Sequence, residues 1–217
     1  MHELIKRLLT SIIILPIVVY CIYYSGLYFH FLLIFLYIVC FYEIYKNVKK
    51  KYFILFSNIV LLIAFFSIYK LRGDSEYNLV FLLWVLSTTF LSDIGGYVVG
   101  KTLKGKKLSK ISPNKTYSGS LGAIIFSLLG IPAINLFQEL FFNLVIIDFF
   151  FIKYFLFSIL ISIICQLGDI YISSLKRRLN IKDTSNLLPG HGGFLDRIDG
   201  LIFVLIFVYF SHPLFLN

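Results

Sequence analysis

The chain has 217 residues, 59% of them hydrophobic, and a mean hydropathy of +0.89, which excludes an ordinary soluble domain. Lys and Arg exceed Asp and Glu to give a formal net charge of +9. In so apolar a chain this excess is typical of the cytoplasmic loops of a membrane protein, and we expect no nucleic-acid binding.

Apolar runs recur along the whole chain. A helix needs about 20 predominantly apolar residues to cross the hydrocarbon core of a bilayer. We expect spans over residues 8–24, 27–45, 52–69, 78–98, 119–137, 152–172 and 199–214. The predicted fold is therefore all-α, a polytopic transmembrane helical bundle of about seven spans, with residues 1–217 forming a single integral-membrane domain.

The connections between the spans alternate in charge. The first span follows Lys6 and Arg7 without a small-x-small cleavage site, so we expect it to be uncleaved. Basic residues cluster again in "KNVKKK" (46–51), "GKTLKGKKLSKISPNKTYSG" (100–119) and "SLKRRLNIKD" (174–183), whereas the other connections are poor in charge or balanced. Since basic loops stay in the cytoplasm, this pattern predicts a cytoplasmic N-terminus.

Two features of the apolar runs carry minor predictions. The segment "NLVIIDFFFIKYF" (143–155) contains Asp148 and Lys153, and we expect an interfacial or re-entrant helix before the sixth span. The three cysteines, Cys21, Cys40 and Cys165, lie in apolar runs without paired spacing. They are predicted to be packing residues, not members of a disulfide framework or a zinc site.

Ionisable residues gather where the predicted topology places the inner ends of spans. Asp93 lies near the end of the fourth span and Asp169 near the end of the sixth. Asp196 and Asp199 lie at the start of the seventh. Such residues normally face a polar cavity and are candidates for function. Two structural alternatives stay open: a buried ion pair between Asp93 and a loop lysine, or a solvated acidic helix start at the seventh span.

Three of these carboxylates are predicted to converge. Asp196 and Asp199 are three residues apart and share a helix face, and the sixth span, with Asp169, runs antiparallel to the seventh. Converging carboxylates repel unless cations lie between them, and Mg²⁺ binds carboxylates together with substrate phosphates. We expect a Mg²⁺ site here, and a second cation is left open. Arg197 either contacts an anionic substrate or neutralises the acids.

A glycine-rich loop precedes the seventh span. Gly190, Gly192 and Gly193 flank His191 and would let backbone N–H groups approach a phosphate. His191 is open to three interpretations: an acid or base, a phosphate donor, or a loop residue. With the basic residues nearby, the pattern indicates a polyanionic substrate used with a divalent metal at a membrane-embedded site. The basic residues are Lys115, Lys176, Arg177 and Lys182.

The run "SLKRRLNIKDTSNLLPGHGGFLDRID" (174–199) resembles the signature of phosphatidate cytidylyltransferases, also called CDP-diacylglycerol synthases. Upstream, "SDIGGYVVGKTLKGKKLSKISPNKTYSGSLG" (92–122) resembles the second landmark of that family, an S-D segment followed by a serine-proline-x-lysine-threonine loop. Tyr117 is followed by Ser118 where the family usually has glutamate. The first three spans resemble the family only in being apolar, and the chain is short for it, so we expect an N-terminal span to be missing.

The resemblance implies that the chain transfers the cytidylyl group of CTP to phosphatidic acid, with Mg²⁺ on Asp169, Asp196 and Asp199. It implies N-terminal spans in residues 1–77 and catalytic spans and cytoplasmic loops in 78–217. The residues expected in catalysis are Asp169, Asp196, Asp199, Lys176, Arg177, His191 and Arg197. Those expected to bind substrate are Asp93, Lys115, Thr116, Ser174, Lys182, Asp183, Gly192 and Gly193.

The expected location is the cytoplasmic membrane of a bacterium, because the composition favours an AT-rich genome. Membrane lipids are expected partners, and a homodimer is left open. Three alternatives remain: a CTP-dependent polyprenol kinase, a non-catalytic scaffold, and an ion-coupled transporter with Asp93, Asp169 and Asp199 as its pathway. Transporters usually place such residues near the bilayer midplane in repeated, broken helices.

Overall fold

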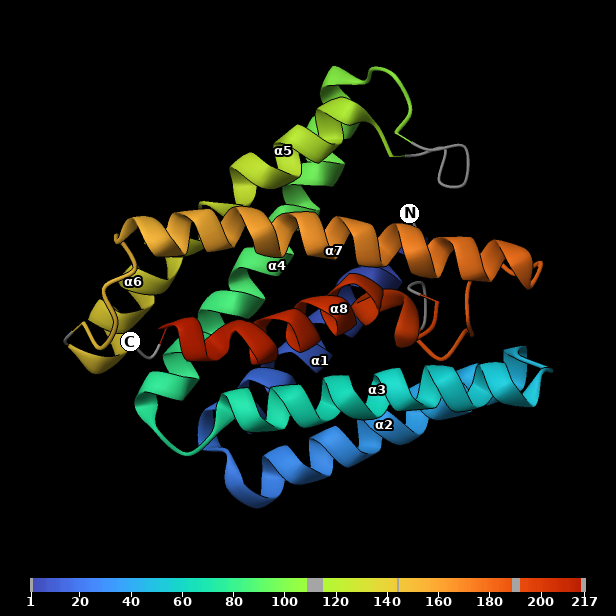
Figure 1. Ribbon diagram of the computed structural model, residues 1–217, viewed down its shortest axis with the longest axis horizontal. Helices are drawn as coiled ribbons and strands as arrows, with labels where there is room; N and C mark the ends of the chain where they lie inside the picture. Colours follow the sequence, from blue (N-terminus) through green and yellow to red (C-terminus); the bar gives the residue numbers. More distant parts are fainter. Residues whose placement is uncertain (1, 109–114, 144, 189–191, 216–217) are drawn as a thin grey trace.

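A computed structural model describes residues 2–108, 115–143, 145–188 and 192–215 (Figure 1). Within these ranges the chain forms helices and no strand, which confirms the predicted all-α fold. The helices are α1 (His2–Tyr24), α2 (Gly26–Asn47), α3 (Lys51–Arg72), α4 (Glu76–Leu103), α5 (Tyr117–Ser127), α6 (Gly130–Phe142), α7 (Ile152–Arg178) and α8 (Leu195–Ser211), followed by the 3₁₀-helix η1 (His212–Phe215).

Six segments of the described chain are long and apolar enough to cross a membrane: α2, α3, α4, α5 together with α6, α7, and α8 with the start of η1. The apolar part of α1, Ile12–Tyr24, is shorter. The predicted multi-pass bundle is therefore confirmed. The fifth predicted span, 119–137, is two helices, because a turn at Leu128 and Leu129 separates α5 from α6. A cytoplasmic N-terminus stays a prediction.

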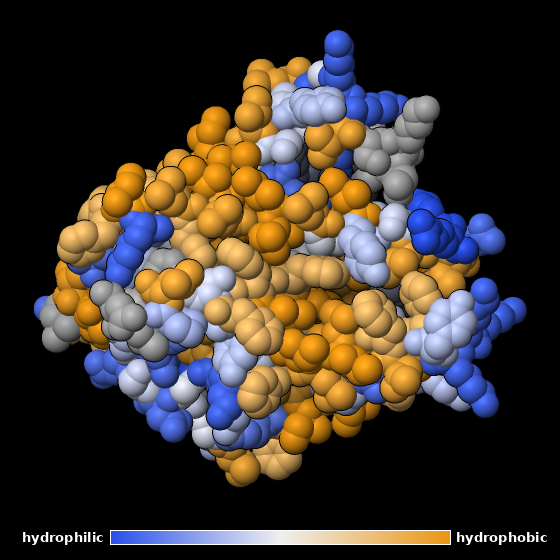
Figure 2. Space-filling model, in the orientation of Figure 1, coloured by the Kyte–Doolittle hydropathy of each residue, from blue (hydrophilic) through white to orange (hydrophobic). Residues whose placement is uncertain are grey.

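The surface of the bundle has the polarity of a membrane protein. On the face shown in Figure 2, a broad apolar area lies between hydrophilic residues at two opposite ends. Large apolar side chains such as Ile34, Phe56 and Leu160 are exposed. In water these surfaces would be unfavourable, whereas lipid tails solvate them without cost.

The packing of the helices brings distant parts of the chain to one end. α8 packs against both α7 and α3, and α7 runs antiparallel to α8 (Figure 1). The end of α7, the start of α8 and the connection from α2 to α3 therefore meet at the same end of the bundle. α4 and α5 pack closely together, and α5 also contacts α7.

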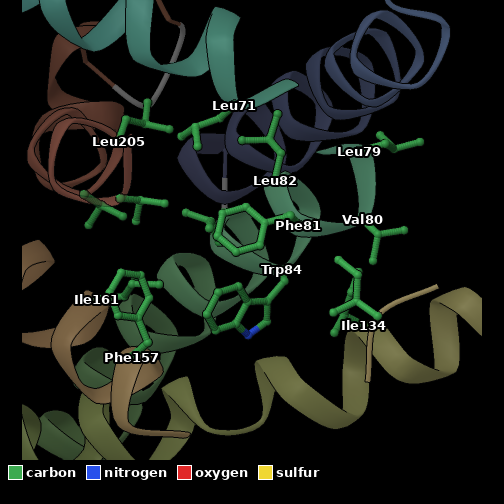
Figure 3. Close-up of a cluster of buried hydrophobic side chains, with 14 of the residues drawn as sticks. Leu71, Leu79, Val80, Phe81, Leu82, Trp84, Ile134, Phe157, Ile161 and Leu205 are labelled. Atoms are coloured by element: carbon green, nitrogen blue, oxygen red, sulfur yellow. The ribbon is translucent and has the colours of Figure 1, made fainter. Parts of the chain in front are cut away.

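The apolar core surrounds Trp84 on α4 (Figure 3). The fully buried Trp84 ring lies with its centroid 5.1–6.2 Å from those of four other aromatic rings. These rings belong to Phe81, Phe149, Tyr154 and Phe157. Aromatic pairs at such separations add to the hydrophobic stabilisation of a core. The cluster involves the first halves of α4 and α7. It therefore lies away from the end of the bundle where α7 ends and α8 begins.

The segment before α7 corrects a prediction. Residues 145–151 form turns rather than an interfacial or re-entrant helix, and α7 begins at Ile152. The buried side chain of Gln138 accepts hydrogen bonds from the backbone N–H groups of Ile146 and Ile147, at 2.9 and 2.8 Å. Ile147 and Phe149 are buried in the core. The apolar character of this segment therefore comes from packing against the protein.

Small residues allow α4 and α5 to approach closely, as is common between membrane helices. A Cβ atom added at Gly95 would lie 2.4 Å from Cβ of Phe126 and 2.6 Å from the carbonyl oxygen of Gly122. At the neighbouring Gly96 the nearest atom, Cβ of Ala123, would be 3.5 Å away, which is an ordinary contact. The close approach therefore depends on Gly95.

Gly95→Ala is expected to lower the free energy of unfolding by about 1–3 kcal/mol, because the added methyl group forces the two helices apart. Thermal unfolding of the purified protein in detergent would measure this loss. Gly96→Ala is the matched control and should unfold close to the wild-type temperature. Equal stability of the two variants would contradict the packing described.

Candidate functional site

A lysine in the last turn of α7 joins two carboxylates of α8. Nζ of Lys176 lies 2.8 Å from Oδ1 of Asp196 and 3.6 Å from Oδ2 of Asp199. The three side chains are 13%, 4% and 18% exposed, so little water screens their charges. The predicted proximity of Asp196 and Asp199 is therefore confirmed, with a cation between them.

A second ion pair lies on the neighbouring side of α7. Nζ of Lys115 donates to Oδ2 of Asp169 at 2.9 Å. Ligand atoms of Asp93, Cys165 and Asp169 all lie within 4.8 Å of one another. Sγ of Cys165 donates to Oδ1 of Asp93 at 3.5 Å. Cys165 is buried, as predicted for a packing residue, and it also forms part of the site.

The two ion pairs form one group. The carboxyl group of Asp199 interacts with that of Asp169. A Cβ at Gly200 would lie 2.5 Å from Oδ1 of Asp169, so this carboxylate rests directly on the backbone of α8. We call these four neighbouring carboxylates, in the spatial order Asp93, Asp169, Asp199 and Asp196, the carboxylate row.

The carboxylate row has the composition of a cation site. Its four carboxylates and the two lysines that contact them carry a formal charge of −2. A divalent cation matches this charge, and hard carboxylate oxygens are the ligands that Mg²⁺ prefers. The residues present therefore fit the predicted metal.

The second oxygen of Asp196 holds the loop between α7 and α8. Oδ2 accepts hydrogen bonds from the backbone N–H groups of Thr184 and Gly193, at 2.8 and 3.0 Å, and lies 3.0 Å from the Thr184 hydroxyl. Leu188 and Gly192 exchange two backbone hydrogen bonds of 2.9 and 3.2 Å. Only Oδ1 of Asp196 therefore faces the carboxylate row.

A polar cleft of about 330 Å³ opens beside Asp169. Its lining includes Asp93, Lys115, Thr116 and Gln166. The hydroxyl of Thr116 caps α5 by accepting a hydrogen bond from the N–H of Gly119 at 3.1 Å. The cleft thus brings one cation, Lys115, and the hydroxyl of Thr116 to the same space as Asp93 and Asp169.

Ser118, which stands where the resemblance leads one to expect glutamate, has a local role in the structure. Its hydroxyl donates to the backbone carbonyl of Lys104 and lies 3.0 Å from the hydroxyl of Thr116. It thereby joins the end of α4 to the start of α5.

An apolar groove lies on the other side of Lys176. It runs between α3 and α7 over the start of α8, and Lys176 is part of its lining. The other lining residues include Phe53, Phe56, Val60, Tyr171, Leu175 and Phe203. Lys176 thus stands where an apolar surface meets the carboxylate row.

The other predicted residues that the structure describes are not members of the carboxylate row. Four of them are exposed: Arg177, Lys182, Asp183 and Arg197. The hydroxyl of Ser174 donates within its own helix to the carbonyl of Tyr171 at 2.7 Å. Gly192, at φ +85°, lies against Asp196, because an added Cβ would come within 3.3 Å of its Oδ2. His191 lies outside the described residues.

Glu43 on α2 is a site residue that the sequence analysis missed. It is fully buried and accepts hydrogen bonds from both ends of the loop between α7 and α8. The signal was present, because Glu43 is an ionisable residue within an apolar span. No motif surrounds it, and its partners are 141–152 residues away in the chain.

Comparisons with known proteins all identify cytidylyltransferases as the proteins that this chain is similar to. A model of the cytidylyltransferase family matches residues 46–215. A protein of Bacillus subtilis called phosphatidate cytidylyltransferase is 36% identical over 164 residues, 75% of this chain and 58% of that protein. One of the same name from Helicobacter pylori is 36% identical over 141 residues, 64% and 48% of the two chains. Another from Rickettsia bellii is 30% identical over 218 residues, 99% and 93%. The chain spans about half the length of the first two relatives.

Proposed function

The chain belongs to the cytidylyltransferase family, and from this premise we propose that it transfers the cytidylyl group of CTP to phosphatidic acid, forming CDP-diacylglycerol and pyrophosphate. The observation that carries this proposal is the carboxylate row, with its two lysines, lying between a polar cleft and an apolar groove. A nucleotide dissolved in water and a lipid held in a bilayer can react only at such a boundary.

In this proposal each substrate approaches from its own side of α7. The triphosphate of CTP occupies the polar cleft, beside Lys115 and Thr116. Phosphatidic acid places an acyl chain in the apolar groove and its phosphate group beside Lys176. The two phosphates then meet at Asp169 and Asp199.

The proposed reaction needs little acid–base catalysis by the protein. A phosphate oxygen of phosphatidic acid attacks the α-phosphorus of CTP in line; a new P–O bond forms while the bond from the α-phosphorus to the β-phosphate oxygen breaks, and pyrophosphate leaves. The nucleophile is already an anion, so positioning and charge neutralisation dominate. Lys115 and Lys176 would turn from their carboxylates towards the phosphates. Further positive charge would come from Arg177, Lys182, His191 and Arg197.

We propose Mg²⁺ as the cofactor, held by Asp169 and Asp199, with Asp93 beside them. Oδ1 of Asp196 joins this set when Lys176 turns to a phosphate, because that lysine is its partner in the row. When bound, the ion would neutralise part of the negative charge that the two substrates bring to the site. We further propose that the site faces the cytoplasm in the cytoplasmic membrane, where CTP is available.

Labelled CTP tests the function directly. Membranes containing the chain, phosphatidic acid and Mg²⁺ are expected to transfer label from the α-phosphate of CTP into lipid, and EDTA should abolish the transfer. Label from the γ-phosphate should leave as pyrophosphate. Entry of the γ-label into lipid would instead identify a lipid kinase. A folded protein that labels no lipid from either position would overturn the proposal.

A further inference from the structure

Glu43 places a carboxylate in the protein interior at the site end of α2, where it is 0% exposed. It accepts four hydrogen bonds. Oε2 accepts from the hydroxyl of Thr184 and the N–H of Leu195, at 3.0 and 2.9 Å. Oε1 accepts from the hydroxyl of Ser185 and the N–H of Phe194, at 2.5 and 2.9 Å. Four donors compensate the cost of burying this carboxylate.

Two of these donors lie at the start of a helix. Phe194 is the N-cap of α8 and Leu195 its first residue, and such N–H groups have no partner within their own helix. The helix dipole also favours a negative charge at this position. Glu43 therefore caps α8 from a different helix. A Cβ at Gly193 would lie 2.8 Å from both oxygens of Glu43, so a glycine is needed for this close approach.

The same residues connect Glu43 to Asp196. The hydroxyl of Thr184 lies 3.0 Å from Oε2 of Glu43 and 3.0 Å from Oδ2 of Asp196. Asp196 also accepts the N–H of Gly193, directly before the residues that Glu43 caps. One helical turn after Glu43, Asn47 donates to the carbonyl of Thr184 at 2.6 Å. A shift of the Glu43 carboxylate would therefore move Thr184 and Asp196 together.

We propose that Glu43 is a positioning residue for the transferase site. Through Thr184 and the start of α8, it holds Asp196, and Lys176 with it, in the geometry that the reaction requires. This inference rests on the proposed function, because it assigns Asp196 and Lys176 to the reacting centre. Glu43 precedes residue 46, where the match to the family model begins. The carboxylate row itself is built from α4, α7 and α8, and the inference gives α2 a part in holding it.

Glu43→Gln tests the proposal, because the amide keeps the size of the side chain and removes its charge. Each oxygen of Glu43 accepts a hydrogen bond from one backbone N–H group. The NH₂ group of glutamine cannot accept, so one of these two N–H groups would lose its partner. We expect kcat to fall about 10- to 100-fold, the usual loss when an outer residue that orients a site is changed. KM for CTP should change little, since the polar cleft is lined by other residues. Hydrogen exchange should accelerate in residues 184–188 and 192–195 and stay slow in the core around Trp84.

Further variants separate positioning from general stability. Glu43→Asp keeps the charge and should retain a higher kcat than Glu43→Gln; the reverse order would overturn the proposal. Thr184→Val removes the shared hydroxyl, and its effect on kcat should be less than additive with that of Glu43→Gln. Glu139→Gln, an exposed carboxylate on α6, is the control and should behave as wild type.

The hydrogen-exchange experiment does not depend on catalytic activity. If the wild-type chain transferred no cytidylyl group, the proposed function would fail, while hydrogen exchange in residues 184–188 and 192–195 would still decide whether Glu43 holds these segments. Unchanged exchange in Glu43→Gln, or a kcat that falls only with the folded fraction, would overturn the positioning role.

Discussion

Asp199→Asn is expected to lower kcat by about 10³-fold or more, since it weakens both charge neutralisation and the proposed metal site. Asp199 is the central member of the carboxylate row: its Oδ2 lies 3.6 Å from Nζ of Lys176, and the carboxylate of Asp169 lies against the next residue, Gly200. Asparagine has nearly the same shape, so the change removes a charge with little change in packing. Initial rates with α-labelled CTP at saturating substrate would measure the loss.

The control for this prediction is a carboxylate far from the row. Glu139→Gln makes the same kind of change on α6, where the side chain is exposed. Its rate should match that of the wild type. An Asp199→Asn protein that kept a rate within about twofold of wild type would exclude Asp199 from the reacting centre.

Lys176→Met is expected to reduce kcat about 10²- to 10³-fold, comparable to the loss of one preorganised donor in an active site. The unbranched methionine side chain fills much of the same space, but it leaves Asp196 and Asp199 facing each other without the ammonium group. KM for phosphatidic acid should also rise, because Lys176 is the cation at the end of the apolar groove. Kinetics with varied lipid at fixed CTP would separate the two effects.

Arg178→Met is the matched control for Lys176. Arg178 lies two residues further along the last turn of α7 and is exposed. Its substitution removes the same charge from the same end of α7, so a general effect of basic charge on lipid binding would lower kcat equally in both variants. Equal losses would contradict the specific placement of Lys176.

The spans were predictable because hydropathy is a property of each residue and needs no knowledge of contacts. The same reasoning fails where apolar residues pack against protein. Ile147 and Phe149 gave the segment before α7 an apolar character, yet both are buried in the core and the segment forms turns. The break between α5 and α6 was also missed, although Gly130 and Pro132 directly follow Leu129 and favour the start of a new helix there.

The candidate site was predictable where its residues are close in sequence. Asp196 and Asp199 share a helix face by spacing alone, and the structure brings them together. What each oxygen contacts could not be foreseen. Oδ2 of Asp196 is occupied by Thr184 and Gly193, and Glu43 reaches the site across 141 residues of chain. Such pairings depend on tertiary packing, which leaves no local pattern.

Trp84 is the only tryptophan of the chain, and its buried indole gives the protein a built-in spectroscopic reporter. Asp93 lies nine positions further along α4, or about 14 Å at 1.5 Å per residue. Its fluorescence emission should therefore shift to longer wavelength when the bundle unfolds and stay unchanged when only the loop around Asp196 loosens. A single emission spectrum can thus tell an inactive variant that has lost its fold from one that has lost only its site.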